Sequence, residues 1–332
     1  MAATSTDRRR VAWLVARVVA SIAMLALLVT QVDDVDLSDA IPEWGPSTAA
    51  WLAGALLLTF GGIALSAVRW KQVLHALGVE SRWSRLMSHY LAGQFVSNVL
   101  PTTIGGDILR VARLSRENGE SPTTFASVVI ERLSGWLVLP LITLIGLAAN
   151  PGLRELGRAT RFAVLVAVLT LIALTLVLVA VNDRRVGGRF ATSEGWRRFA
   201  GAVHLGVARL REHPAAAIGV LAVGFAYQMV LVLAAAMAAR ALGLPDVGLT
   251  ALLTFLPAVL IVQVLPIGIS GLGLREGAFV LFLGPLGVPS AQAIALGLLL
   301  YLLNLVTSLA GAPAFALGGG RRAVPSEIDA VV

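Results

Sequence analysis

The sequence contains no cysteine, a single lysine, and only 14% charged residues in a chain of 332. The absence of cysteine excludes disulfides, thiolate metal sites and cysteine nucleophiles. The four histidines are scattered without a pair at helical spacing, so we expect neither a metal ion nor another cofactor. An ordinary soluble domain is about 25% charged. A soluble globular fold is therefore excluded.

Hydrophobic residues make up 57% of the chain, and the mean hydropathy is +0.84. Residues 162–182, 214–239, 247–274 and 277–320 contain no charge at all, and each run is long enough for a span of roughly 20 residues. Lipid admits only helices or closed barrels, and these runs lack the alternation of barrel strands. The sequence predicts an all-α polytopic membrane protein. The expected hydrophobic segments, about seven to nine helices with two of the segments broken, are 11–30, 48–68, 86–101, 123–149, 162–182, 214–239, 250–266, 276–288 and 291–315.

One motif occurs twice without a gap. Residues 99–110 read VLPTTIGGDILR, and residues 264–275 read VLPIGISGLGLR, so the two prolines lie 165 positions apart, at 101 and 266. Each copy interrupts an apolar run with Pro, then Gly, then Arg. Paired broken segments in the two halves of a hydrophobic chain point to a transporter's binding site. We therefore expect two re-entrant segments, in halves 48–149 and 214–315, related by an internal and inverted repeat.

The formal charge of +7 comes from arginines in the loops between apolar runs. Such loops orient a membrane protein with its arginines in the cytoplasm, and they do not indicate nucleic acid. The loops 69–85 and 183–213 are therefore assigned to the inside, and residues 194–211 to an amphipathic helix on the inner surface. A full crossing by 86–101 would carry the following arginines outside, so this segment is expected to dip in and return. The matching segment of the second half should enter from outside.

These assignments define the predicted organisation of the chain. Residues 1–10 form a cytoplasmic tail, 11–318 a single transmembrane domain, and 319–332 a second cytoplasmic tail. Residues 11–30 are too long for a signal-peptide core and lack a small-residue cleavage site, so they are expected to remain as the first span. The predicted location is the cytoplasmic (plasma) membrane.

Several ionisable residues fall within hydrocarbon depth, where they are functional candidates by default. They are Asp107, Glu131, Arg132, Arg275 and Glu276, with Arg110 at the edge, and their charges sum to zero. Adjacent side chains on a helix point apart, so Arg275 is expected to pair with a remote residue such as Glu131 rather than with Glu276. Functional use of these charges and a purely structural network of ion pairs both fit the sequence.

The broken segments supply further candidates for binding a substrate. A helix restarting near Gly106 would aim its N–H groups at an anion, and Arg110 would add a bidentate contact. The candidates of the first half are Asn98, Pro101, Thr102, Thr103, Gly105, Gly106, Asp107, Arg110, Glu131 and Arg132. Those of the second half are Gln263, Pro266, Gly268, Ser270, Gly271, Arg275 and Glu276.

Together, the Arg69-Trp70 pair, Leu77-Gly78, residues 95–110, Glu131-Arg132 and residues 266–276 resemble the lysylphosphatidylglycerol synthase transmembrane-region family, also called flippase-like domain proteins. The resemblance extends over about residues 10–318. In bifunctional members this module is attached to a cytoplasmic aminoacyl-transferase domain and moves the modified lipid. The chain ends at Val332 without such a domain, so synthase activity is not expected. The resemblance implies a lipid flippase whose path is lined by the buried charges.

The predicted function is therefore translocation of a lipid with an anionic headgroup, such as a phospholipid, an aminoacyl-phospholipid or a polyprenyl-phosphate-linked glycolipid. The sequence has no G-x-S-x-G, H-E-x-x-H or Walker motif, so the protein is not expected to be an enzyme. The expected partners are membrane lipids and a separate lipid-modifying enzyme. Two alternatives remain open: an intramembrane lipid-linked transferase using Glu131 or Asp107 as base, and a non-catalytic scaffold.

Overall fold

The computed structural model describes residues 19, 23, 44–99, 105–182, 194–265, 267 and 270–318. The described residues form helices and contain no strand. The first half comprises α2 (Pro46–Ala76), α3 (Trp83–Val99), α4 (Gly105–Asn118), α5 (Ser121–Ala149), the short η1 (Pro151–Glu155) and α6 (Arg158–Asn182). The second comprises α8 (Glu194–Glu212), α9 (Pro214–Ala241), α10 (Leu249–Val262), α11 (Leu274–Leu283), the short η3 (Gly284–Leu286), α12 (Ser290–Leu309) and α13 (Gly311–Leu317).

Five helical segments within the described residues are long and apolar enough to cross a membrane: α2, α5, α6, α9, and α12 with α13. They coincide with five of the spans expected from the sequence, which confirms a multi-pass helical membrane protein. The expected first span 11–30 and both tails lie outside the described residues, apart from positions 19 and 23. The domain boundaries at 10 and 318 stay predictions.

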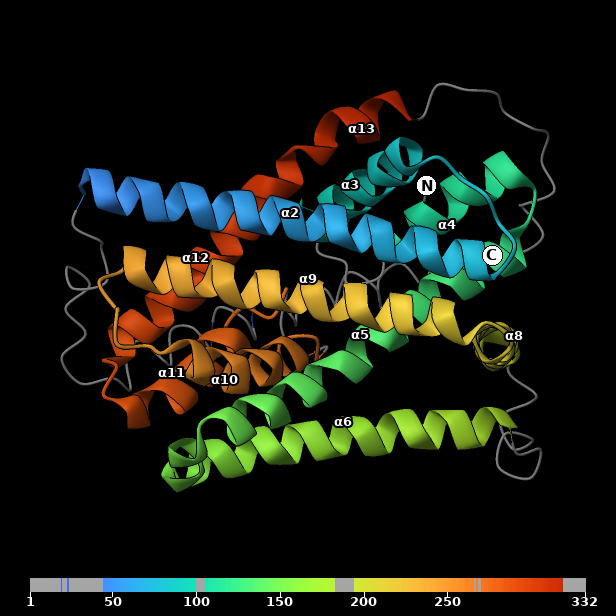
Figure 1. The fold of residues 1–332 in the computed structure, drawn as a ribbon. Helices are drawn as coiled ribbons and strands as arrows, with labels where there is room; N and C mark the ends of the chain where they lie inside the picture. Colours follow the sequence, from blue (N-terminus) through green and yellow to red (C-terminus); the bar gives the residue numbers. More distant parts are fainter. Residues whose placement is uncertain are drawn as a thin grey trace.

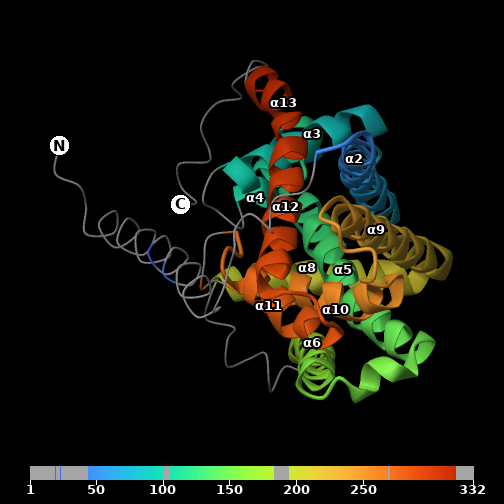
Figure 2. The same cartoon turned by 90° about the vertical axis from the view of Figure 1, so that its left-hand side faces the viewer.

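The long helices α2 and α9 lie side by side and run in opposite directions (Figures 1 and 2). Both begin with a proline. Proline lacks a backbone N–H, and at the first position of a helix that N–H would have no partner within the helix, so nothing is lost. Both end in the same hydrogen-bonded turn. Val79 N–H donates to Leu74 O at 2.9 Å, and Leu244 N–H donates to Ala239 O at 2.9 Å, around glycines at φ +81° and +72°. Only glycine adopts this backbone without strain, so the Leu-Gly pair ends each helix at the same place.

The helices that flank the two broken segments lie towards opposite ends of the bundle in Figure 1. Helices α3 and α4 pack together at the end where α2 finishes and α5 begins. Helices α10 and α11 lie towards the other end, where α12 begins. The apolar core follows this division, with one cluster of buried side chains around Trp70 and Leu86 and a larger one around Phe255 and Phe282.

Helix α8 is viewed along its axis in Figure 1, whereas α2, α6 and α9 run across the picture. It therefore lies perpendicular to the long helices at their shared end. Ala202, Val203 and Gly206 are buried, and Gly206 packs directly against Ile130 of α5. The arginines of α8 are exposed. This is the geometry of an amphipathic helix, as the sequence predicted for 194–211.

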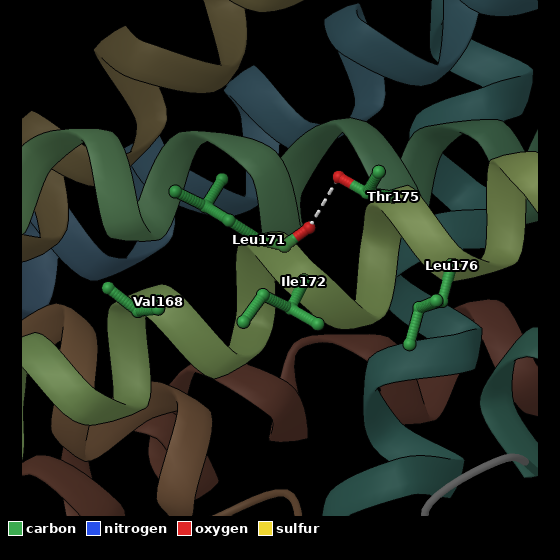
Figure 3. A pocket seen from close by; sticks show the side chains of 5 residues that line it. All are labelled: Val168, Leu171, Ile172, Thr175 and Leu176. Carbon is green, nitrogen blue, oxygen red and sulfur yellow. Dashed lines mark hydrogen bonds between the residues drawn. The ribbon is translucent and has the colours of Figure 1, made fainter.

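Helix α6 borders the bundle in Figure 2, and most of its apolar side chains are exposed or only partly buried. A shallow hollow on this helix is lined by Val168, Leu171, Ile172, Thr175 and Leu176 (Figure 3). The one hydroxyl there donates to a backbone carbonyl of its own helix, from Thr175 Oγ1 to Leu171 O at 2.8 Å. The hollow thus offers no unpaired polar side chain, and it suits contact with acyl chains.

Candidate functional site

A cluster of charged side chains lies where α2, α4 and α5 meet. At its centre is Glu131 of α5, whose side chain is 1% exposed. Arg69 Nη2 donates to Glu131 Oε1 at 2.5 Å, and Arg110 donates through both terminal nitrogens to Oε2 at 3.1 Å. Both carboxylate oxygens thus hold a guanidinium. Removing Glu131 would leave the buried Arg69 without an anionic partner among the described residues.

Asp107 joins a second, outer part of this cluster. It lies in the first turn of α4 and accepts from Arg110 Nη2 at 2.6 Å. Arg132 of α5 makes a bidentate contact with the same carboxylate, from Nε to Oδ2 and from Nη2 to Oδ1, each at 2.9 Å. Arg110 therefore links Glu131 to Asp107, and the five charges form one connected network.

Aromatic rings enclose the arginines of the cluster. The guanidinium of Arg110 lies over the rings of Tyr90 and Trp70, 4.4 and 5.0 Å from the centroids. The guanidinium of Arg69 lies over Tyr227, at 5.4 Å. Such contacts stabilise a cation where water is excluded. The rings thus help to keep these arginines charged inside the protein.

Exposure rises from the inner to the outer part of the cluster. The side chains of Glu131 and Arg110 are 1% and 2% exposed, whereas those of Asp107 and Arg132 are 19% and 49% exposed. The network is therefore sealed on the Glu131 side and open on the Arg132 side. A ligand would first meet Arg132 and Asp107.

The cluster is also unbalanced in charge. Three arginines face two carboxylates, which leaves a formal excess of +1. Within the described part of the chain, Nε and Nη1 of Arg69 have no hydrogen-bond partner. Gly135 and Gly224 lie close against this guanidinium, since a Cβ on them would lie 3.1 and 3.5 Å, respectively, from Nη1. The arrangement can accept one further negative charge.

Two glycines bring α4 close enough to build the site. Gly106 lies against the backbone carbonyl of Gly93 on α3, and a Cβ at Gly93 would lie 3.0 Å from Cγ of Arg110. The stem of Arg110 therefore runs across Gly93 towards Glu131. Gly106, a predicted site residue, acts here through close packing of two helices. Gly105 begins α4.

The remaining candidates of the first half lie elsewhere. Asn98 donates from Nδ2 to Gln94 O of its own helix at 3.0 Å, and within the described residues no ion pair or side-chain hydrogen bond joins it to the charged cluster. Pro101, Thr102 and Thr103 lie outside the described residues, as do Pro266 and Gly268 of the second half.

The described end of the second broken segment has left-handed backbone at three residues. Ser270, Gly271 and Gly273 have φ of +51°, +73° and +84°. Gly271 lies against the backbone and Cβ of Gln263, so a side chain at position 271 would collide with it. Gln263 and Gly271 thus contribute close chain packing to the turn.

The expectation of a remote partner for Arg275 is wrong. Arg275 Nη2 donates to Glu276 Oε1 at 2.6 Å, and Glu276 Oε2 accepts from the backbone N–H of Gly273, also at 2.6 Å. Both residues belong to the first turn of α11, where Glu276 turns back to cap the helix and Arg275 folds over Tyr301. At a helix start the rule that neighbours diverge gives way to capping. Among the described residues, no ion pair joins this neutral pair to the Glu131 cluster.

Sequence reasoning missed Arg69 as a site residue by placing it in the cytoplasmic loop 69–85. Helix α2 continues to Ala76, so Arg69 lies inside it and is buried against Glu131. The aromatic residues Trp70, Tyr90 and Tyr227 were also missed. The Arg69-Trp70 pair in the family resemblance was the signal that pointed to this region.

Comparison with known proteins bears on the whole chain. Residues 14–311 match the family described as the lysylphosphatidylglycerol synthase TM region. The protein named glycosyltransferase AglD from Haloferax volcanii is 28% identical over 334 aligned residues, which cover 90% of this chain and 53% of the relative. The chain thus spans about half the length of this curated relative. Because the family match covers most of the residues, the chain belongs to the lysylphosphatidylglycerol synthase TM region family.

Proposed function

We propose that this protein translocates a lipid with an anionic headgroup across the cytoplasmic membrane and is not an enzyme. The observation that carries the proposal is the cluster of Arg69, Arg110, Arg132, Glu131 and Asp107, which is buried around Glu131, open at Arg132 and has an excess of one positive charge. A charged group at hydrocarbon depth costs several kcal/mol unless it is paired or hydrated. An anionic headgroup would neutralise the excess while its acyl chains stay in lipid.

The helix bounds support two related halves around this cluster. Shifted by 165 residues, α2 would span 211–241 and α3 would span 248–264, and α9 and α10 span 214–241 and 249–262. The same shift takes α4 to 270–283, where α11 spans 274–283. The opposite directions of α2 and α9, and the opposite ends towards which the helices flanking the broken segments lie, favour an inverted repeat with two re-entrant hairpins. Transporters built in this way bind substrate near mid-bilayer.

The arginine-rich end of the bundle, which carries α8 and the start of α5, is proposed to face the cytoplasm. Because the chain lacks cysteine, single introduced cysteines test this directly. Glu212→Cys lies at the arginine-rich end, and Asp246→Cys lies in the exposed connection between α9 and α10. In intact cells a membrane-impermeant maleimide should label Asp246→Cys alone, and Glu212→Cys should react after permeabilisation. The opposite pattern would reverse the proposed orientation.

Transport itself is tested with purified protein in liposomes that contain a fluorescent phosphatidylglycerol. Wild-type protein should make the inner-leaflet label accessible to an external quencher faster than empty liposomes do. Arg132→Gln removes an exposed charge of the cluster and should slow this rate roughly tenfold or more, because a hydrogen bond to a charged group contributes about 1.5–3 kcal/mol.

The matched control for Arg132→Gln is Arg116→Gln. Arg116 is an exposed arginine near the end of α4, outside the cluster. Its substitution should leave the rate unchanged. Equal rates for the wild type and Arg132→Gln would remove the cluster from the transport path, and equal rates for protein-containing and empty liposomes would refute translocation of this lipid.

An intramembrane lipid-linked transferase is the second candidate, and the name of the Haloferax volcanii relative favours it. In that mechanism Glu131 or Asp107 would act as a base, but both carboxylates are held by arginines. A covalent product formed from lipid and an activated donor would support this candidate. A non-catalytic scaffold for a lipid-modifying enzyme would instead keep full function after the cluster is replaced by alanine.

A further inference from the structure

We propose that the carboxylate of Asp107 takes the place of the headgroup anion in the unliganded protein. It pairs with Arg132 and Arg110 until a negatively charged headgroup displaces it. This inference rests on the proposed function, and it identifies Asp107 as the residue that competes with the headgroup for these arginines. The carboxylate of Asp107 is the ligand that Arg132 and Arg110 hold in the described structure.

The contact geometry is that of a bound anion. Arg132 reaches Asp107 with Nε and Nη2, one nitrogen to each carboxylate oxygen, and both distances are 2.9 Å. Guanidinium groups hold carboxylate and phosphate oxygens in this same bidentate manner. Arg110 adds a third contact at 2.6 Å. A phosphate group placed at the Asp107 carboxylate would therefore meet three donors already in position.

Asp107 differs from Glu131 in being able to leave. The Glu131 side chain is sealed, and arginines from two different helices hold it. The Asp107 side chain is 19% exposed, and its chief partner Arg132 is 49% exposed. Asp107 belongs to α4 and Arg132 to α5, so a rotation of one side chain breaks their contact while the Arg110–Glu131 pair still joins the two helices. The outer carboxylate is thus the one that an incoming headgroup can replace.

The internal repeat provides a comparison within the same chain. At the spacing of 165 residues, Arg110 corresponds to Arg275, but Asp107 corresponds to Leu272. Arg275 is instead neutralised by its neighbour Glu276, which is fully buried and also caps the backbone of Gly273. Of these two matching sites, the first alone combines, within the described residues, an exposed arginine with a partly exposed carboxylate. Headgroup binding is therefore assigned to the first half.

The test is Asp107→Asn, which keeps the size of the side chain and removes its charge. Its affinity for short-chain phosphatidylglycerol in detergent micelles is compared with that of the wild type. If the free arginines are populated in about a tenth of wild-type molecules, removing the competitor should strengthen binding roughly tenfold. Phosphatidylcholine, which carries no net charge, should gain much less. Titration with inorganic phosphate separates recognition of the free anion from recognition of the lipid.

Two further variants complete the experiment. Glu120→Gln removes one negative charge from an exposed residue just before α5 and should bind phosphatidylglycerol like the wild type. Asp107→Ser also removes the carboxylate but leaves a smaller polar side chain, and it should also bind more tightly. If both Asp107 variants fold and bind no more tightly than the wild type, the inference is overturned. Loss of folding in both would also overturn it, since Asp107 would then be indispensable to the structure.

The outcome is separable from that of the proposed function. Wild-type protein that neither binds nor moves phosphatidylglycerol would contradict translocation of this lipid. Wild-type protein that does both, with Asp107 variants of unchanged affinity, would contradict only the role assigned to Asp107.

Discussion

Replacing Glu131 with glutamine should destabilise the protein by about 3–5 kcal/mol, the typical effect of removing one partner from a buried ion pair. Glutamine has the same size as glutamate, so the loss isolates the charge. Arg69 would keep no anionic partner in the described structure, and Arg110 would keep only Asp107. Thermal unfolding in detergent micelles should show a much lower Tm, or the variant should fail to purify as a monodisperse protein.

The double variant Glu131→Gln/Arg69→Met provides the check on this cause. It removes Arg69, the cation that the single variant leaves without an anionic partner, and it should recover part of the lost stability. Glu120→Gln, which removes an exposed charge, should unfold like the wild type. A Glu131→Gln protein as stable as the wild type would show that the cluster does not depend on this carboxylate.

Substituting alanine for Gly106 should disrupt both the α3–α4 contact and the site built on it. A Cβ at this position would overlap the carbonyl oxygen of Gly93 and the hydroxyl of Ser97. Overpacking of this kind typically costs about 1–3 kcal/mol because the backbones must separate. Separation of α4 would also draw Arg110 away from Glu131. We expect a lower Tm together with at least a roughly tenfold loss of phosphatidylglycerol affinity, since about 1.4 kcal/mol corresponds to tenfold.

Gly61→Ala is the matched control for Gly106→Ala. Gly61 lies within α2, and a Cβ there would meet nothing within 4 Å. Alanine forms helix better than glycine by about 1 kcal/mol, so this variant should be as stable as the wild type or more so. Equal behaviour of the two alanine variants would contradict the close helix crossing.

The elements of the fold were predictable where a single physical requirement governs the chain. The uncharged runs must become helices in lipid, because every backbone N–H and C=O has to be satisfied within the segment. The repeated Pro-Gly-Arg motif also marked where helices stop: α3 ends at Val99, α4 begins at Gly105, and α11 begins at Leu274. Among the candidate site residues, Asp107, Arg110, Glu131 and Arg132 do lie in one cluster.

The pairings among these charges were not predictable in the same way. Arg69 was assigned to a loop because charge usually ends a span, yet its helix continues and the side chain turns inward to Glu131. Arg275 was assigned a distant partner because adjacent helical residues diverge, yet the helix start lets Glu276 fold back. Both errors arise because a side chain's partner depends on the neighbouring helix and on the local backbone.

Composition and the spacing of apolar, proline and glycine residues are thus enough to establish a multi-pass helical membrane protein with two broken segments. Those properties determine which segments become helices, because transfer into lipid requires each segment to form its own backbone hydrogen bonds. The sealed Glu131, the exposed Arg132 and the excess positive charge came only from the packing of α2, α4 and α5. Burial and ion pairing depend on contacts between segments far apart in sequence. Only the three-dimensional packing therefore distinguishes the neutral Arg275–Glu276 pair of the second half from the open cluster around Glu131 in the first, with its excess positive charge.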